Sequence, residues 1–199
     1  MEENLLLNNI RSFVQLSEQD WHWIISLGVE KTFRKGDYLS REGEICRFTH
    51  FIESGSGRVF YIDPAGIEHV VQLGIRGWWI SDFAGFKNQA KGLLNVEALE
   101  TTKVISFSYE NFQIIYEKVP LFERFYRLLI QKAYASFQNR VLQNISMDAE
   151  QRYIEFRDKY PDMDASISQK HIASYLGMSA EFLSKIKKRL HAKRSTKTS

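Results

Sequence analysis

Cysteine and long apolar runs are nearly absent from this sequence. The single cysteine, Cys46, excludes an internal disulfide and a four-thiolate zinc or iron–sulfur site, and the five histidines lack the spacing of metal ligands. No stretch approaches the roughly 18 consecutive apolar residues of a membrane-spanning helix. Acidic residues stand near the start, where a signal peptide carries basic ones. We therefore expect a cytoplasmic protein with no metal, no cofactor and no membrane partner.

Catalytic arrangements are also missing. No Ser/His/Asp set, carboxylate pair or Walker motif stands out. The tripeptide Gly55-Ser56-Gly57 resembles a nucleophile or phosphate loop, but it lies between strand-like runs rather than before a helix, which favours a hairpin turn. We expect no enzyme activity and assign no catalytic residue.

Glycine is scarce outside one part of the chain. Nine of the eleven glycines fall between Gly36 and Gly92, and between them lie short runs rich in β-branched and aromatic residues, such as FTHFIE, RVFYI and HVVQL. Short strands with frequent turns predict an antiparallel roll or barrel over about residues 31–108. The stretch before it, 16–27, has the pattern of a short helix with Ser17 as its N-cap.

From Pro120 to Met147 the chain has no glycine and no second proline, and apolar residues recur at helical spacing on more than one face. A helix of this length extends about 40 Å, which is more than a small domain needs. The second apolar face therefore indicates a partner chain, and we expect a homodimer. The alternative is that both faces pack within one subunit.

The segment 167–190 has the pattern of two short helices joined at a glycine. Residues 169–176 fit the first helix, Gly177 supplies the positive φ that ends it, and Ser179 caps the second. Ala173 leaves room for a close crossing. The apolar positions Ile172, Leu176, Met178, Leu183 and Ile186 agree with a helix-turn-helix.

Acidic residues are absent from the end of the chain. Seven of the 27 Lys and Arg residues follow Phe182, so residues 1–181 carry 20 basic side chains against all 24 acidic ones. The outward positions of the second helix suit the major groove of DNA and its phosphates. A solvated basic tail and an ordinary helical hairpin are the alternatives. The expected DNA-binding residues are Lys170, Ser179, Ala180, Glu181, Ser184, Lys185, Lys187, Lys188 and Arg189.

With these features the chain resembles the Crp/Fnr family of bacterial transcription regulators. FRKGDYLSREGE (33–44) and VEALETTKVISFS (96–108) are similar to parts of that family's roll. QKHIASYLGMSAEFLSKIKKRL (169–190) is similar to its helix-turn-helix, above all in the short regulators of Bacteroidetes-type bacteria. The resemblance implies an α+β chain: a cyclic-nucleotide-binding-like sensor domain (1–118), an antiparallel β-roll of the double-stranded β-helix or jelly-roll type; a dimerisation helix (119–147); and a helix-turn-helix domain (148–199).

The same resemblance places base contacts on Ala180, Glu181 and Lys185. Ala180 offers a methyl group, Glu181 accepts from a cytosine amino group, and Lys185 donates to guanine. The family's wing is missing, because HAKRSTKTS (191–199) is too short and polar, and we expect a flexible basic tail instead. The implied partners are double-stranded DNA with a pseudo-palindromic site, a second copy of the chain, and RNA polymerase. The alternative is a small-ligand sensor whose helix-turn-helix contacts proteins.

The sensor departs from relatives that bind cyclic nucleotides. Those relatives hold the ribose with Gly-Glu and the cyclic phosphate with Arg followed by Ser or Thr, whereas this chain has Ser81-Asp82 and Gly92-Leu93. A cyclic phosphate without a nearby cation is poorly stabilised, so we expect no tight binding of cyclic AMP and leave the effector open. Two tryptophans could stack on another ligand, although aromatic residues in a roll more often belong to the core. The ligand-pocket candidates are Trp78, Trp79, Ser81, Asp82, Gly92 and Leu93.

Overall fold

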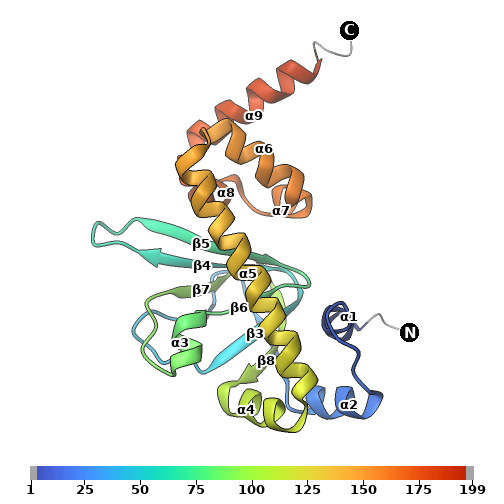
Figure 1. The fold of residues 1–199 in the computed structure, drawn as a ribbon. Coiled ribbons are helices and arrows are strands. Elements are labelled where there is room, and N and C mark those ends of the chain that lie inside the picture. Colours follow the sequence, from blue (N-terminus) through green and yellow to red (C-terminus); the bar gives the residue numbers. More distant parts are fainter. Residues whose placement is uncertain (1–3, 196–199) are drawn as a thin grey trace.

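The fold consists of two antiparallel sheets, a long helix and a group of helices at the C-terminal end (Figure 1). The computed structural model describes residues 4–195, with side chains described through Ala192. One sheet has the strand order β1-β8-β3-β6 and the other has β2-β7-β4-β5. The strands are β1 (Val29–Phe33), β2 (Tyr38–Ser40), β3 (Phe48–Ser54), β4 (Ser56–Ile62), β5 (Glu68–Ile75), β6 (Trp79–Ile80), β7 (Asn95–Ala98) and β8 (Thr102–Ser108).

The two sheets share an apolar core. Ile52 and Val104 of one sheet and Val59 and Val96 of the other belong to one buried cluster, so the sheets close on each other as a roll. The mixed helix and antiparallel-sheet class predicted from the sequence is confirmed. At the turn between β3 and β4, Gly55 has a φ of +86°, and an added Cβ would stand 2.6 Å from the Thr101 carbonyl oxygen. The Gly-Ser-Gly tripeptide is therefore a tight strand junction.

Helices surround the roll and extend from it. The N-terminal helices are α1 (Leu5–Arg11) and α2 (Glu18–Ser26), and the Ser17 hydroxyl caps the second by accepting from Asp20 N. Within and after the roll lie α3 (Phe83–Asn88) and α4 (Tyr109–Lys118). The remaining helices are α5 (Pro120–Ser146), α6 (Ala149–Lys159), α7 (Pro161–Ser166), α8 (Gln169–Tyr175) and α9 (Ala180–Ser195).

The long helix α5 begins against the roll and ends beyond it (Figure 1). Phe122, Phe125 and Tyr126 in its first two turns are buried in a cluster with Phe107 and Phe112 of the roll and α4. The helix spans nearly the range predicted from Pro120, and the boundaries of the three predicted domains stay predictions. None of the helices in the described residues combines the length and apolar character that crossing a bilayer requires.

Candidate nucleic-acid interface and sensor site

The glycine-bent helix pair is formed by α8 and α9. Gly177 has a φ of +67°, and the Met178 N–H donates to the Ala173 carbonyl at 3.0 Å, which folds the chain back after α8. The Ser179 hydroxyl then accepts from the Phe182 N–H at 3.1 Å and so caps the first turn of α9. Backbone geometry and capping therefore determine where the second helix begins.

The facing sides of the two helices are buried. Ile172, Leu183 and Ile186 are fully buried, and Ala173 is 1% exposed at the crossing. Their cluster extends to α6 and α7, and it includes the roll residues Phe60, Val70 and Leu73. The helix pair is thus a packed unit attached to the outer side of β4 and β5.

The helix α9 extends outward from the rest of the molecule (Figure 1). Ser179, Glu181, Lys185, Lys188 and Arg189 are exposed on it. Three other predicted residues of this helix, Ala180, Ser184 and Lys187, are partly buried, and Lys170 on α8 is exposed.

The predicted cations fall into two groups by their partners. Lys187 Nζ lies 2.8 Å from Asp164 Oδ1 and Arg189 Nη2 lies 2.9 Å from Glu150 Oε2, so both are paired within the domain. Lys170, Lys185 and Lys188 form no ion pair within residues 4–192. The predicted basic tail is helical through Ser195, because α9 continues to that residue, and residues 196–199 lie outside the described residues. Residues 191–195 of the predicted tail therefore continue α9.

A polar contact joins α8 to β5. The Ser174 hydroxyl accepts from Val70 N–H at 3.0 Å and donates to the Glu68 carbonyl at 3.1 Å. Beside it, His171 Nδ1 lies 3.4 Å from Arg58 Nη1. Burial, together with the charges of Arg58 and Lys170, lowers the pKa of His171. The position of the helix pair is thus tied by hydrogen bonds to the roll.

Arg58 is the charged centre of this contact. Its side chain is 6% exposed and lies 2.6 Å from Glu68 Oε2 and 2.6 Å from Glu97 Oε2. Burial opposes the charge, yet hydrogen bonds to both carboxylates raise the pKa of Arg58. This arrangement could not be predicted from the sequence, because its members come from four separate elements, β4, β5, β7 and α8.

The two tryptophans considered as ligand-stacking groups are packed within the protein. Trp79 makes ring contacts with Phe51, Phe107 and Phe125, and its Nε1 donates to Asn9 Oδ1 at 3.1 Å. Trp78 makes an edge contact with Tyr160, at 5.7 Å between ring centroids. In this structure one ring fills the roll's core and the other joins the roll to the C-terminal helices.

Asp82 occupies the place where the resemblance implies ribose binding. The side chain is buried, its Oδ1 accepts from Gly85 N at 3.1 Å, and its Oδ2 accepts from Leu94 N at 3.4 Å. An added Cβ at Gly92 would stand 2.4 Å from that Oδ2, so the two predicted segments meet. The carboxylate between them is already bound by backbone N–H groups of the chain.

The remaining two candidates lie at the edge of this arrangement. The Ser81 hydroxyl is 3.5 Å from Thr49 Oγ1, at the limit of a hydrogen bond. Leu93 is 73% exposed and points its apolar side chain at solvent. Among the described residues, Asp82 forms no ion pair, and Gly92 stands at the position that the resemblance gives to the phosphate-binding arginine.

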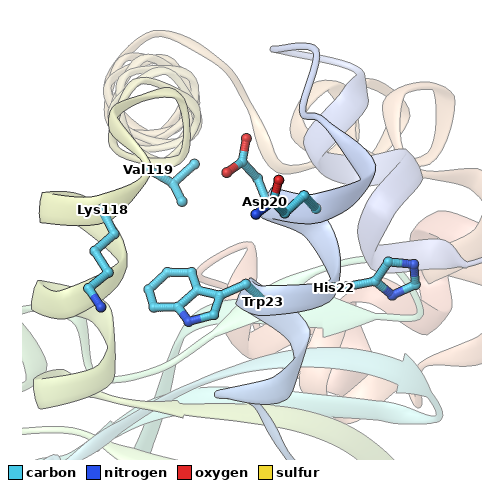
Figure 2. Close-up of a pocket in the computed structure, with 6 residues that line it drawn as sticks. Asp20, His22, Trp23, Lys118 and Val119 are labelled. Carbon is cyan, nitrogen blue, oxygen red and sulfur yellow. The ribbon is translucent and has the colours of Figure 1, made fainter.

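An open cavity of about 610 Å³ lies elsewhere, between α2 and the junction of α4 with α5 (Figure 2). Lys118 reaches over the Trp23 ring there, with Nζ 5.4 Å from the ring centroid. None of the pocket candidates from the sequence lines it, and within the described residues no cluster of His, Cys, Asp or Glu is arranged to hold a metal. The remaining lining residues are Gln19, Asp20, His22 and Val119.

The second half of α5 carries an exposed apolar seam. Its members lie on one side of the helix, three or four residues apart except for one adjacent pair, and the last of them is 78% exposed. Each of these side chains is at least 41% exposed. The seam consists of Tyr134, Phe137, Val141, Leu142 and Ile145.

Comparisons with known proteins agree with this fold. Residues 30–119 match the family model of the cyclic nucleotide-binding domain. Among solved structures, the chain is similar to the c-di-GMP-responsive global regulator CLP of Xanthomonas campestris, at 13% identity and a TM-score of 0.71 over 89% of this chain and 93% of that one. None of the curated sequences compared with the chain matches it.

Two further structures of this type share the fold. FixK2 of Bradyrhizobium japonicum is 18% identical with a TM-score of 0.71, over 83% of this chain and 85% of that one. A CooA variant of Carboxydothermus hydrogenoformans is 17% identical with a TM-score of 0.68, over 96% of this chain and 86% of that one. These neighbours are Crp/Fnr-type regulators, and at such identities the likeness establishes the fold.

Proposed function

We propose that this chain is a sequence-specific, DNA-binding transcription regulator of the Crp/Fnr type. It binds a pseudo-palindromic site as a homodimer and does not respond to cyclic AMP. The observation that carries the proposal is the exposed side of α9, where Lys185 and Lys188 project without an ion pair among the described residues, opposite a fully buried face. The fold shared with Crp/Fnr-type regulators supports it.

The proposed interface divides into base contacts and phosphate contacts. With the N-terminal turns of α9 in the major groove, Lys185 donates to guanine and Glu181 accepts from a cytosine amino group. Hydrogen bonds from its own backbone N–H and from the Ser179 hydroxyl lower the pKa of Glu181, which keeps it an acceptor. Ala180 offers its methyl group, and Ser184 lies on the same helix one turn on.

Phosphate neutralisation falls first to Lys170 and Lys188, which are exposed and form no ion pair within residues 4–192. Lys187 and Arg189 contribute only when they leave Asp164 and Glu150. Ser179 and the N-terminus of α9 provide a further phosphate contact. Binding should therefore weaken with salt by about 0.9 log units per log unit of salt for each phosphate neutralised.

The apolar seam of α5 is the proposed dimer interface. Five exposed apolar side chains at helical spacing would be covered by the same seam of a second copy. A dimer through α5 presents two copies of α9, and a symmetric site requires these to enter successive major grooves roughly 34 Å apart. RNA polymerase is the further partner proposed, and the effector is left open.

The deciding experiment is selection of bound duplexes from a random DNA pool with the full chain. A symmetric pair of half-sites about one helical turn apart is the expected result. Lys185→Ala should then lose about tenfold or more in discrimination between the selected site and random DNA. Lys35→Ala removes the same charge from an exposed turn of the roll and should leave discrimination unchanged.

Two results would contradict the proposal at different levels. Should Lys185→Ala bind as selectively as the wild type, the assignment of base contacts is wrong. Should no duplex be selected, while gel filtration shows a complex with a protein partner instead, the alternative sensor module with a protein-binding helix-turn-helix is correct.

A further inference from the structure

We infer that Phe182 determines specificity in the proposed DNA complex, by placing its ring against the 5-methyl group of a thymine in each half-site. The inference rests on the proposed function, and it adds a large apolar contact to an interface whose other members, apart from the Ala180 methyl group, are charged and polar.

Phe182 is unusual in its surroundings. It is 46% exposed, and it is the one large apolar side chain left exposed between Met147 and Ala192, within the range where side chains are described. Its neighbour Leu183 and the residue Ile186 are fully buried and determine which face of α9 meets the domain core. Phe182 lies about 100° around the helix from Leu183, so its ring cannot join that core.

The position of Phe182 on the helix is well defined. Its backbone N–H donates to the capping Ser179 hydroxyl at 3.1 Å, which places the residue in the first turn of α9. Recognition helices contact base edges with this N-terminal part. Lys185 follows three residues later and is therefore a neighbour on the helix surface. Phe182 therefore lies on the helix surface next to the residue that we assign to guanine.

The chemistry of the major groove selects the occupant. Thymine carries the groove's one apolar group, its 5-methyl, whereas the other positions are hydrogen-bond donors and acceptors. A ring pressed against a polar base edge would remove its water without replacing the hydrogen bond, which is unfavourable. Contact with a thymine methyl removes apolar surface from water on both sides. The flanking Lys185 and Lys188 supply the charge that holds the helix against the duplex.

The test removes that methyl group and nothing else. In the duplex selected by the wild-type chain, deoxyuridine replaces thymine at one half-site position per duplex, first in one half-site and then at the equivalent position of both. Dissociation constants are measured by fluorescence anisotropy. At one position the wild type should lose about fourfold in affinity when one methyl group is removed, which is the change expected for burying one methyl group. Removal from both half-sites should cost about fifteenfold. Phe182→Ala should bind the thymine and uracil duplexes equally.

Two controls separate the contact from folding. Ile67→Ala truncates a side chain that is 57% exposed in the turn between β4 and β5, and this variant should keep the wild-type preference for thymine. Phe182→Leu keeps an apolar side chain and should keep part of the preference. Thermal unfolding should coincide for the wild type and Phe182→Ala, because the ring lies outside the core.

Several results would overturn the inference while the proposed function stands. In the first, the wild type binds every uracil duplex as tightly as thymine. In the second, Phe182→Ala retains the preference for thymine. In the third, Phe182→Ala changes transcription in a reaction with RNA polymerase but not DNA affinity, which would assign the ring to a protein contact. Failure to select any duplex would instead remove the proposed function, and this inference with it.

Discussion

The sensor site and the helix pair differ in what their polar side chains contact. Asp82 in the roll is buried and bound by two backbone N–H groups of its own chain. Lys185 and Lys188 on α9 are exposed and have no carboxylate partner among the described residues. The first arrangement is already satisfied, whereas the second carries charge that a ligand can neutralise. The polar groups of the implied sensor site are therefore satisfied within the chain, whereas α9 carries cations that have no carboxylate partner among the described residues.

The largest expected effect concerns the seam of α5, which in the proposed dimer brings two copies of α9 to one DNA site. Replacing Phe137 and Ile145 in the seam by Glu should separate the proposed dimer into monomers, because an apolar interface does not accept unpaired charges. Affinity for the full site should fall by about a thousandfold, since each half-site then binds alone. Glu is a good helix former, so α5 itself should persist. Analytical ultracentrifugation and anisotropy measure the two changes.

The matched control for the seam is Leu121→Glu, on the same helix but 40% exposed at its roll end. This variant should remain a dimer with wild-type affinity. If the double variant sediments as a dimer, α5 does not pair through the seam, and the symmetric model of binding loses its basis.

The second prediction tests the ion pairs of Arg58, which lie in the roll beside its contact with α8. Arg58→Met leaves Glu68 and Glu97 without their cation, and breaking such a buried pair costs about 3 kcal/mol in the free energy of unfolding. Arg76→Met, at an exposed position after β5, should change stability little. Urea titration followed by circular dichroism measures both. Equal unfolding midpoints for the two variants would show that the Arg58 ion pairs contribute nothing to the stability of the fold.

The third prediction concerns acid stability of the roll. His50 is fully enclosed, with Nδ1 2.9 Å from Ser106 Oγ, and burial together with the charge of Lys31 lowers its pKa to about 3. A folded-state pKa below the unfolded one favours the neutral ring. The stabilisation is therefore complete above about pH 6.5 and is lost as pH falls toward 3, by about 2 kcal/mol at pH 5.

A variant without a titrating ring isolates that contribution. The difference in unfolding free energy between pH 7 and pH 5 should be smaller for His50→Gln than for the wild type, by about 2 kcal/mol. Carboxylates titrate alike in both chains, so the comparison removes them. Parallel pH profiles would mean that His50 does not oppose acid unfolding.

The sequence predicts the parts of this fold that depend on local signals. Pro120 begins α5, Gly177 takes the positive φ, and Ser17 and Ser179 cap their helices as expected. The helices α1, α3, α4 and α7 were missed, and three of these have only six or seven residues, too few to show a periodic pattern. The equally short α8 was predicted because Gly177 and the apolar positions of α9 mark its end.

Contacts between distant elements were beyond sequence reasoning. Lys185 and Lys187 are equivalent as cations in the sequence, but only Lys187 meets a carboxylate, and that carboxylate belongs to α7. In the sequence Arg58 is an ordinary strand residue, and only the fold shows that side chains of β5, β7 and α8 surround it. Which charges are left open is decided by packing between elements.

The smallest expected effect is no effect. Titration calorimetry with cyclic AMP and cyclic GMP should show no micromolar binding, because Gly92 stands where the resemblance implies the phosphate-binding arginine, and the nearby Asp82 carboxylate is already bound by backbone N–H groups. Gly92→Arg, which restores the family's cation in sequence, should not rescue binding, since its Cβ would stand 2.4 Å from Asp82 Oδ2 and displace that carboxylate. Micromolar binding by the wild type would mean that Asp82 leaves its backbone donors for a ligand. The roll, like the helix pair, would then present polar groups to a ligand.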